Sequence, residues 1–200
     1  MNRSYLWIWV FFFTCAICAS IPAMAGEPTE MVRKTTDKII TILTDPSLEG
    51  PEKAAERKRL VREAVSEQFN REEMSRRTLA QHWSKRTEGE KKEFVDLYAK
   101  LLEQTYLDRV EGYSGEKVFY KGEEVDGKYG VVRVKILTEQ GTEIAVEYRL
   151  KKTGDDWLVY DVSIEGVSLV NNYRNQFNSI IVRSSYKDFI IKLKAKVEKQ

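Results

Sequence analysis

The sequence predicts an α+β fold in which about four curved antiparallel strands are covered on one face by helices. Three observations lead to this prediction. Apolar residues recur at helical spacing up to about residue 110, alternate with a period of two from Lys117 to Ile164, and return to helical spacing from Leu169 onward. The turns between the alternating segments are short, and short turns join antiparallel rather than parallel strands.

The first 25 residues have the features of a secretory signal peptide. Arg3 precedes an apolar run from Leu6 to about Ala19, and Ala23-Met24-Ala25 matches the small-x-small cleavage pattern. A membrane anchor is the alternative, but the run is short for a span of about 20 residues. We therefore expect residues 1–25 to be cleaved and residues 26–200 to form a single domain.

Cysteine usage and charge limit what this domain can be. Cys15 and Cys18 are the only cysteines and both lie in the predicted signal, so the mature domain must be stabilised by a packed core rather than by disulfides. Cleavage would remove Arg3 and no acidic residue from totals of 33 basic and 31 acidic residues. A nearly balanced charge of this kind gives no overall field that would attract nucleic acid.

Four helices are predicted before the strands. The first covers residues 29–43, and Pro51 begins a second, whose apolar side continues to Phe69. Asn70, followed by two glutamates, suits the start of a short third helix. The sequence Thr87-x-x-Glu90 is a capping box and begins a fourth helix, which has the strongest apolar stripe in the chain.

The predicted strands alternate between an apolar and a polar face. Turn residues separate them at Asp126-Gly127, Gln140-Gly141 and Gly154-Asp155. The face opposite the apolar one is charged in the third strand, so one side of the sheet is expected to meet water. The apolar positions are Val118/Tyr120, Val132/Val134/Ile136, Ile144/Val146/Tyr148/Leu150 and Leu158/Tyr160/Val162/Ile164.

After the strands, the spacing of apolar residues predicts a helix over residues 169–181. It predicts another helix, basic on one side, in the tail YKDFIIKLKAKVEKQ. The tail helix could close the domain, dock on a partner protein, or lie on anionic lipid, and continuity of the apolar stripe favours the first. The residues expected on its apolar face are Phe189, Ile190, Leu193 and Val197, and the cationic ones are Lys187, Lys192, Lys194, Lys196 and Lys199.

Enzyme chemistry finds little support in the sequence. His82 is the single histidine, the mature chain has no cysteine, and no Gly-x-Ser-x-Gly nucleophile elbow, metal-ligand spacing or glycine-rich phosphate loop occurs. Asp161 beside Tyr160 could support proton transfer, but strict alternation would place the two on opposite faces. We expect no catalytic residue, no metal and no cofactor.

The apolar sheet face has two interpretations. It could be ordinary core packed on helices, or it could leave a cavity for an apolar ligand. The residues that would line such a cavity are Val132, Val134, Ile136, Val146, Tyr148, Tyr160, Val162 and Ile164 from the strands, and Leu101, Tyr106, Tyr173 and Phe177 from the helices.

A resemblance to a known family bears on this choice. The segment WLVYDVSIEGVSLVNNYRNQF, residues 157–177, closely resembles the signature of the MlaC family of periplasmic phospholipid-binding proteins, also called the toluene-tolerance family. The likeness extends from about Phe69 to Leu193. Further matches are Leu79-Ala80-x-x-Trp83, Phe94, Leu101-Leu102, Thr105-Tyr106 and Val146-x-Tyr148. Ala80 stands where the family usually has glycine, so a need for positive φ there is in question.

The resemblance implies a cone like that of nuclear transport factor, with helices closing a curved sheet around an apolar cavity. It implies a monomeric periplasmic carrier that shuttles phospholipid between an outer-membrane lipoprotein complex and an inner-membrane ABC transporter with a membrane-anchored lipid-binding subunit. The acyl chains would be buried and the headgroup exposed. Arg174 follows Tyr173 directly and could guide a phosphate at the rim or pair with a neighbouring glutamate, and we expect the glutamate pair.

Two other functions are compatible with the same residues. One is a binding module for a different apolar ligand, such as a quinone, a sterol-like molecule or a solvent. The other is an isomerase or hydratase that uses the same cone.

Overall fold

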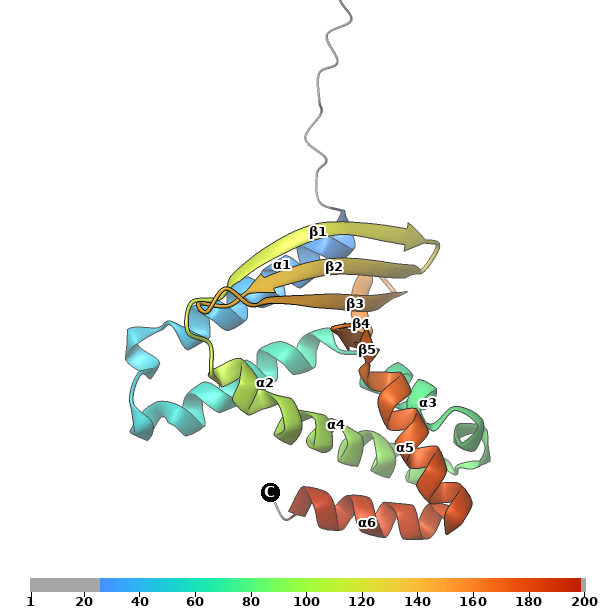
Figure 1. Ribbon diagram of the computed structural model, residues 1–200. Coiled ribbons are helices and arrows are strands. Elements are labelled where there is room, and N and C mark those ends of the chain that lie inside the picture. Colours follow the sequence, from blue (N-terminus) through green and yellow to red (C-terminus); the bar gives the residue numbers. More distant parts are fainter. Residues whose placement is uncertain (1–25, 199–200) are drawn as a thin grey trace, which may run out of the picture.

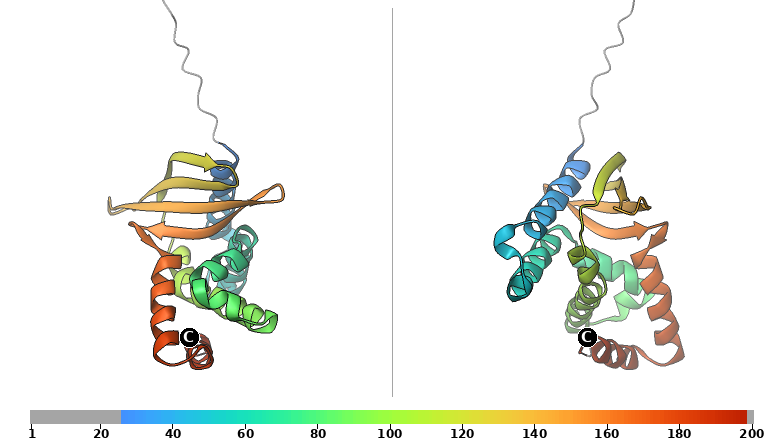
Figure 2. Two further views of the ribbon diagram at one scale, coloured as in Figure 1. Left: turned by 90° about the vertical axis from the view of Figure 1, so that its right-hand side faces the viewer. Right: turned by 60° about the vertical axis from the view of Figure 1, so that its left-hand side comes forward.

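The computed structural model describes residues 26–198, apart from the side chains of Asp108 and Arg109 (Figure 1). The predicted signal peptide and Lys199 lie outside the described residues. In Figure 1 the curved antiparallel sheet lies at the top, the first helix runs beside it, and the other helices lie below it (Figures 1 and 2). Within residues 26–198, no helix has the length and apolar character needed to cross a membrane.

The predicted helices are confirmed. The α-helices are α1 (Glu27–Leu43), α2 (Ala54–Gln68), α3 (Arg71–Leu79), α4 (Glu88–Glu111), α5 (Leu169–Arg183) and α6 (Tyr186–Glu198), with short 3₁₀ turns η1 (Pro46–Leu48), η2 (Pro51–Lys53) and η3 (Ala80–Lys85). Asn70 Oδ1 accepts the Glu73 N–H at 2.9 Å, as expected of an N-cap. The capping box also forms, because the Glu90 N–H reaches Thr87 Oγ1 at 3.2 Å and the Thr87 N–H reaches the Glu90 carboxylate at 2.9 Å.

The sheet contains the four predicted strands and one more. They are β1 (Lys117–Asp126), β2 (Tyr129–Leu137), β3 (Glu143–Thr153), β4 (Asp156–Ile164) and the two-residue β5 (Val167–Ser168). The order is β1-β2-β3-β4-β5 and every neighbouring pair is antiparallel. The three predicted turns join the four long strands, and β5 is too short to leave a pattern in the sequence.

A bulge in β4 corrects one prediction. Leu150 pairs with Val159 but Arg149 pairs with Asp161, so Tyr160 is an extra residue in the ladder. The expected alternation from Leu158 through Tyr160 to Ile164 is therefore wrong, since the bulge transfers the apolar face to Trp157 and Val159.

Tyr160 and Asp161 lie on the same outer face, against the prediction of opposite faces. Asp161 is registered with Arg149, and the Tyr160 ring meets that of Tyr129, a residue registered with Lys151 on the face of Arg149. A bulge places two successive side chains on one side, which strict alternation cannot anticipate.

The apolar interior consists of two clusters. The sheet cluster joins Val32 of α1 to the inner face of β2, β3 and β4, and the helical cluster joins residues of α3, α4, α5 and α6. Phe69 and Leu169 contact both. In the helical cluster, neighbouring aromatic rings of Phe94, Tyr98, Tyr173, Phe177 and Phe189 lie with centroids 4.7–6.0 Å apart.

Helix α6 closes the helical cluster, as the apolar stripe of the tail predicts. The four residues predicted on its apolar face are all at least nine-tenths buried, and Phe189 is only 1% exposed. One of the predicted surface lysines, Lys194, pairs with Glu93 of α4 at 2.5 Å. The helix therefore has a structural role whatever its basic face does.

Helix α1 is attached to the sheet by two carboxylates. Glu123 of β1 accepts the Thr29 N–H at 2.9 Å and so caps α1, whose N-cap Gly26 has no side chain to do so. A Cβ at Gly26 would collide with the Glu123 carboxylate. Glu27 accepts the Trp157 indole N–H at 3.0 Å and the Lys152 ammonium at 2.9 Å.

Position 80, where the family usually has glycine, does have a positive φ. It ends α3 with φ 47° and ψ −117°, a conformation that glycine adopts freely and that strains an alanine.

We predict that Ala80→Gly raises the free energy of unfolding by about 1 kcal/mol, because the relief of strain exceeds the entropy that glycine adds to the unfolded chain. Urea denaturation would measure this, with Ala99→Gly inside α4 as a control that should lose about 1 kcal/mol. Equal losses for both variants would show that Ala80 is unstrained.

Candidate functional site: the inner face of the sheet

The inner face of the sheet holds seven of the eight predicted strand residues. Register places Val132 opposite Tyr148 and Val134 opposite Val146, and Val162 and Ile164 follow from β4. The predicted position of Tyr160 is wrong. Its ring lies on the outer face, where the Arg77 guanidinium is 4.1 Å from its centre.

Burial divides these seven residues. Val132, Val134, Val146 and Val162 are buried, whereas Ile136, Tyr148 and Ile164 are only half-buried although they face inward. An inward side chain that keeps accessible surface borders space that the protein does not fill. Val118, Tyr120 and Ile144 share this property. The same period of two marked them in the sequence, so the signal that could have selected them was available.

Tyr148 combines a deep position in the molecule with incomplete burial. Burial raises the pKa of the Tyr148 hydroxyl to about 12, with a smaller contribution from Tyr120. Its side chain nevertheless keeps some accessible surface. Tyr148 is therefore a deeply placed residue that the protein does not cover completely.

The four predicted helical residues lie in the other cluster. Leu101, Tyr173 and Phe177 are at least 95% buried among aromatic neighbours, and Tyr106 is half-buried at the edge of that cluster. The structure thus does not bring the helical and strand residues together into one group. Tyr106 is the helical residue best placed to border unfilled space, and a role in lipid binding stays a prediction for all twelve residues.

Asp161 has a structural task instead of a chemical one. Its Oδ2 accepts the Ser168 hydroxyl at 2.6 Å and its Oδ1 accepts the Val170 N–H at 3.1 Å, while Arg149 lies 3.9 Å away. These bonds use the carboxylate to hold the start of α5. Arg174 does not make the expected pair with a glutamate; it donates to the Arg77 carbonyl at 2.8 Å and to Asn171 at 2.9 Å.

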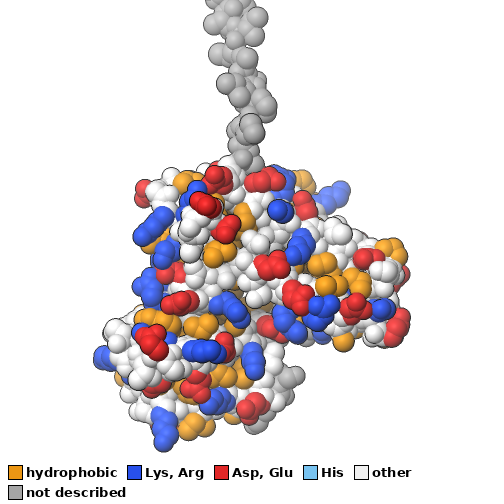
Figure 3. Space-filling model, turned by 180° about the vertical axis from the view of Figure 1, so that it is seen from behind, with side chains coloured by type: hydrophobic (Ala, Val, Ile, Leu, Met, Phe, Trp, Pro, Cys, Tyr) orange, Lys and Arg blue, Asp and Glu red, His pale blue; other side chains and the backbone are white. Residues whose placement is uncertain are grey.

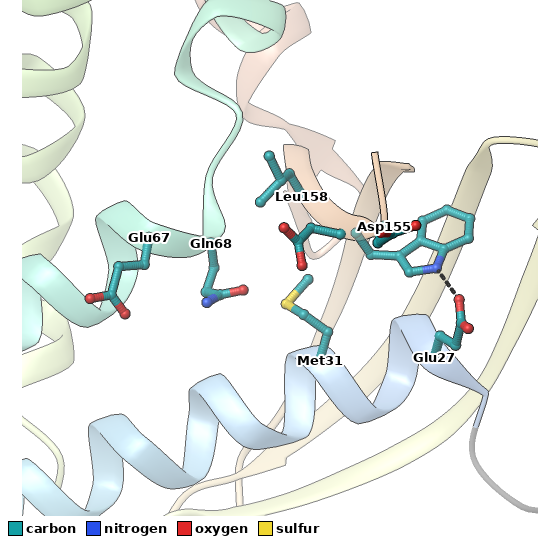
Figure 4. Close-up of a pocket in the computed structure, with 8 residues that line it drawn as sticks. Glu27, Met31, Glu67, Gln68, Asp155 and Leu158 are labelled. Atoms are coloured by element: carbon teal, nitrogen blue, oxygen red, sulfur yellow. Dashed lines mark hydrogen bonds between the residues drawn. The ribbon is translucent and has the colours of Figure 1, made fainter. Parts of the chain in front are cut away.

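A first pocket lies between α1, the end of α2 and the β3–β4 turn (Figure 4). It has a volume of about 290 Å³, and its lining combines Met31 and Trp157 with four carboxylates. Sequence reasoning missed it because its residues come from three distant segments. The lining residues are Glu27, Met31, Glu67, Gln68, Asp155, Asp156, Trp157 and Leu158. Within residues 26–198, no group of histidine and carboxylate side chains is arranged to hold a metal ion.

A second pocket, about 310 Å³ in volume, lies where the start of α3 meets the ends of β2 and β3. Beside it is the buried carboxylate of Glu73, which receives Arg76 at 2.6 Å, Arg77 at 2.8 Å and Lys151 at 3.0 Å. Burial alone would raise the pKa of Glu73, but hydrogen bonds from Arg76, Lys151 and Arg77 outweigh it and lower the pKa to about 2. The lining residues are Asn70, Glu72, Glu73, Arg76, Lys128, Lys151, Lys152 and Thr153.

Fold and site together define an α+β protein in which a curved sheet with an incompletely covered apolar face lies over a helical bundle. A phospholipid-binding protein from Ralstonia solanacearum, solved in complex with a phospholipid, has the same fold. The TM-score is 0.78 over 87% of this chain and 98% of that one, at 24% identity. The chain belongs to the MlaC protein family, whose model matches residues 33–195. The intermembrane phospholipid transport system binding protein MlaC of Haemophilus influenzae is 19% identical over 96% of this chain and 92% of its own.

The Glu73 cluster makes a prediction about acid stability. A carboxyl whose folded-state pKa lies below its ordinary value of 4.5 stabilises the fold above that pH, and the contribution disappears as the pH falls toward 2. We predict that Glu73→Gln flattens the fall in unfolding free energy between pH 4.5 and 2, measured by urea denaturation. Glu72→Gln, at an exposed neighbour, is the control. Parallel pH curves for wild type and Glu73→Gln would contradict the assignment.

Proposed function

We propose that this protein is a periplasmic phospholipid carrier. It takes up a phospholipid with its acyl chains against the inner face of the sheet and its headgroup in water. It moves lipid between an outer-membrane lipoprotein complex and an inner-membrane ABC transporter with a membrane-anchored lipid-binding subunit. The predicted signal peptide delivers it to the periplasm, and it acts by binding rather than by catalysis.

The observation that carries the proposal is the half-buried apolar surface of Ile136, Tyr148 and Ile164 on the inner face of a chain of this family. The phospholipid in the Ralstonia solanacearum relative supports the same ligand class. Exposing acyl chains to water costs about 0.8 kcal/mol per methylene, so a lipid cannot cross an aqueous space at a useful rate without cover. An unpaired phosphate is costly to bury, which keeps the headgroup outside and makes headgroup selectivity weak.

Native mass spectrometry of protein purified without detergent tests this function. We expect a co-purifying mass that matches a diacyl phospholipid. A quinone or another apolar molecule in its place would make the protein a binding module of a different specificity. A protein that is empty after purification from cells and stays empty after incubation with phospholipid vesicles would contradict the carrier function.

The inner face can be tested by one substitution. We predict that Ile136→Glu lowers the bound phospholipid at least about tenfold, because a carboxylate among acyl chains has no partner. Ile136 is half-buried, so the variant should fold, which circular dichroism would verify. Val125→Glu makes the same kind of change at a residue 52% exposed and should keep its lipid. A folded Ile136→Glu protein with a full lipid load would remove this face from the site.

The basic side of α6 predicts a salt-dependent docking step. Lys187, Lys192 and Lys196 are exposed, and Lys194 is left unchanged because it pairs with Glu93. We predict that replacing the three with glutamine keeps folding and bound lipid but slows transfer of a fluorescent lipid to the inner-membrane complex at low salt, since exposed charges act through a screened field. Unchanged transfer rates would leave α6 as scaffold alone.

A further inference from the structure

The second pocket lies far along the sheet from the half-buried apolar surface. Lys128 precedes β2 and Lys151 pairs with Tyr129 at the start of that strand, whereas Ile136 pairs with Ile144 near its other end. A lipid whose chains lie against Ile136 and Ile144 would therefore occupy the opposite end of the strands. The pocket needs a separate explanation.

The charges around this pocket do not balance. Four cations, Arg76, Lys128, Lys151 and Lys152, line it with two carboxylates, Glu72 and Glu73. Lys152 is paired with Glu27 of α1 at 2.9 Å, so the excess lies with the other three cations. Glu73 already receives three cations, because Arg77 joins Arg76 and Lys151 within 3.0 Å of its oxygens. One carboxylate cannot neutralise three cations, so these groups repel one another, and an anion placed among them would relieve that repulsion.

The donors in the pocket suit an oxyanion. Arg76 uses its Nε and Nη2 on Glu73, which leaves further guanidinium N–H groups for a second acceptor. Lys128 is exposed and extends from the β1–β2 turn, where its ammonium lies 5.9 Å from the centre of the Tyr129 ring. The positive end of α3 adds to the field. A volume of about 310 Å³ is ample for a phosphate group and several waters.

We propose that this pocket binds a phosphate-type oxyanion. The first pocket provides a comparison within the same molecule: it has nearly the same volume, but it is lined by four carboxylates. Acidic and basic side chains are interspersed over the face shown in Figure 3. The phosphate can belong to a free ion or to the headgroup of a lipid at a membrane surface, because both present the same oxygens.

An NMR titration with inorganic phosphate at low ionic strength, with sodium chloride as the matched control salt, tests the site. We expect saturable shifts of the amides of Lys128, Lys151 and Thr153 and none at Asp155 and Asp156. Phosphate should also raise the melting temperature above that in chloride. Shifts that are absent from the pocket, or that never saturate, would overturn the proposal.

Variants separate a built site from surface charge. Arg76→Gln with Lys128→Gln should weaken phosphate binding at least about tenfold, since hydrogen bonds to charged groups are the strong ones. Lys34→Gln with Lys100→Gln makes the same change in charge at exposed residues outside the pocket and should bind as wild type does. If Arg76→Gln disturbs the fold around Glu73, Lys128→Gln alone at an exposed turn still tests the site. Equal affinity in both double variants would reduce the effect to nonspecific adsorption and overturn the proposal.

Vesicle sedimentation distinguishes the two sources of phosphate. Weaker binding of the pocket variant, but not of the control, to vesicles of phosphatidylethanolamine and phosphatidylglycerol would assign the site to headgroups. Unchanged vesicle binding with lost phosphate binding would assign it to the free ion. Bound acyl lipid is measured separately by native mass spectrometry, so the carrier function and this site can fail independently.

Discussion

The buried carboxylate of Asp161 is the interaction on which the arrangement of the two layers depends. It lies at the point where the sheet ends and α5 begins, and it accepts the Ser168 hydroxyl and the Val170 N–H. Ser168 in turn caps α5 by accepting the Asn171 N–H at 3.0 Å. A buried carboxylate must be paired or fully hydrogen-bonded, and here the bonds that satisfy it also fix the direction in which α5 leaves the sheet. Tyr173 and Phe177 then enter the helical cluster from that helix.

The helical cluster is formed mainly by residues of the helices themselves, so the sheet does not need the helices to cover all of its inner face. Aromatic rings of α4, α5 and α6 fill the helical interior, and α1 covers one end of the sheet. There Gly130 leaves room for the Trp157 ring and Pro28, which a Cβ would approach within 3.1 and 3.4 Å. Ile136, Ile144 and Ile164 lie toward the other end and stay half-exposed. Two separate cores thus leave apolar surface on the sheet that the protein does not cover by packing on itself.

Most of the secondary structure could be predicted from the sequence, and the predictions that were wrong have identifiable physical causes. Periodicity, turn residues and the caps at Asn70 and Thr87 located the helices and the four long strands, since each depends on local chemistry. The bulge at Tyr160 could not be predicted from the sequence. The residues around it alternate as they would in a regular strand, and the change of register appears only in the pairing of β4 with β3. The division of the twelve predicted residues between two clusters also depends on tertiary packing. Each charged pocket combines three segments that are far apart in the sequence, so no local pattern marks it.

The two ends of the sheet are stabilised by different kinds of contact. At the α1 end, Glu27 bonds Trp157 and Lys152 while Glu123 caps Thr29. Each of these contacts is directional, and together they fix the position of the start of α1 on the sheet. At the other end the inner face meets its surroundings through apolar side chains, whose contacts are non-directional and can be exchanged for those of an acyl chain. The α1 end of the sheet is therefore fixed by directional contacts, whereas the other end depends on non-directional packing of apolar side chains.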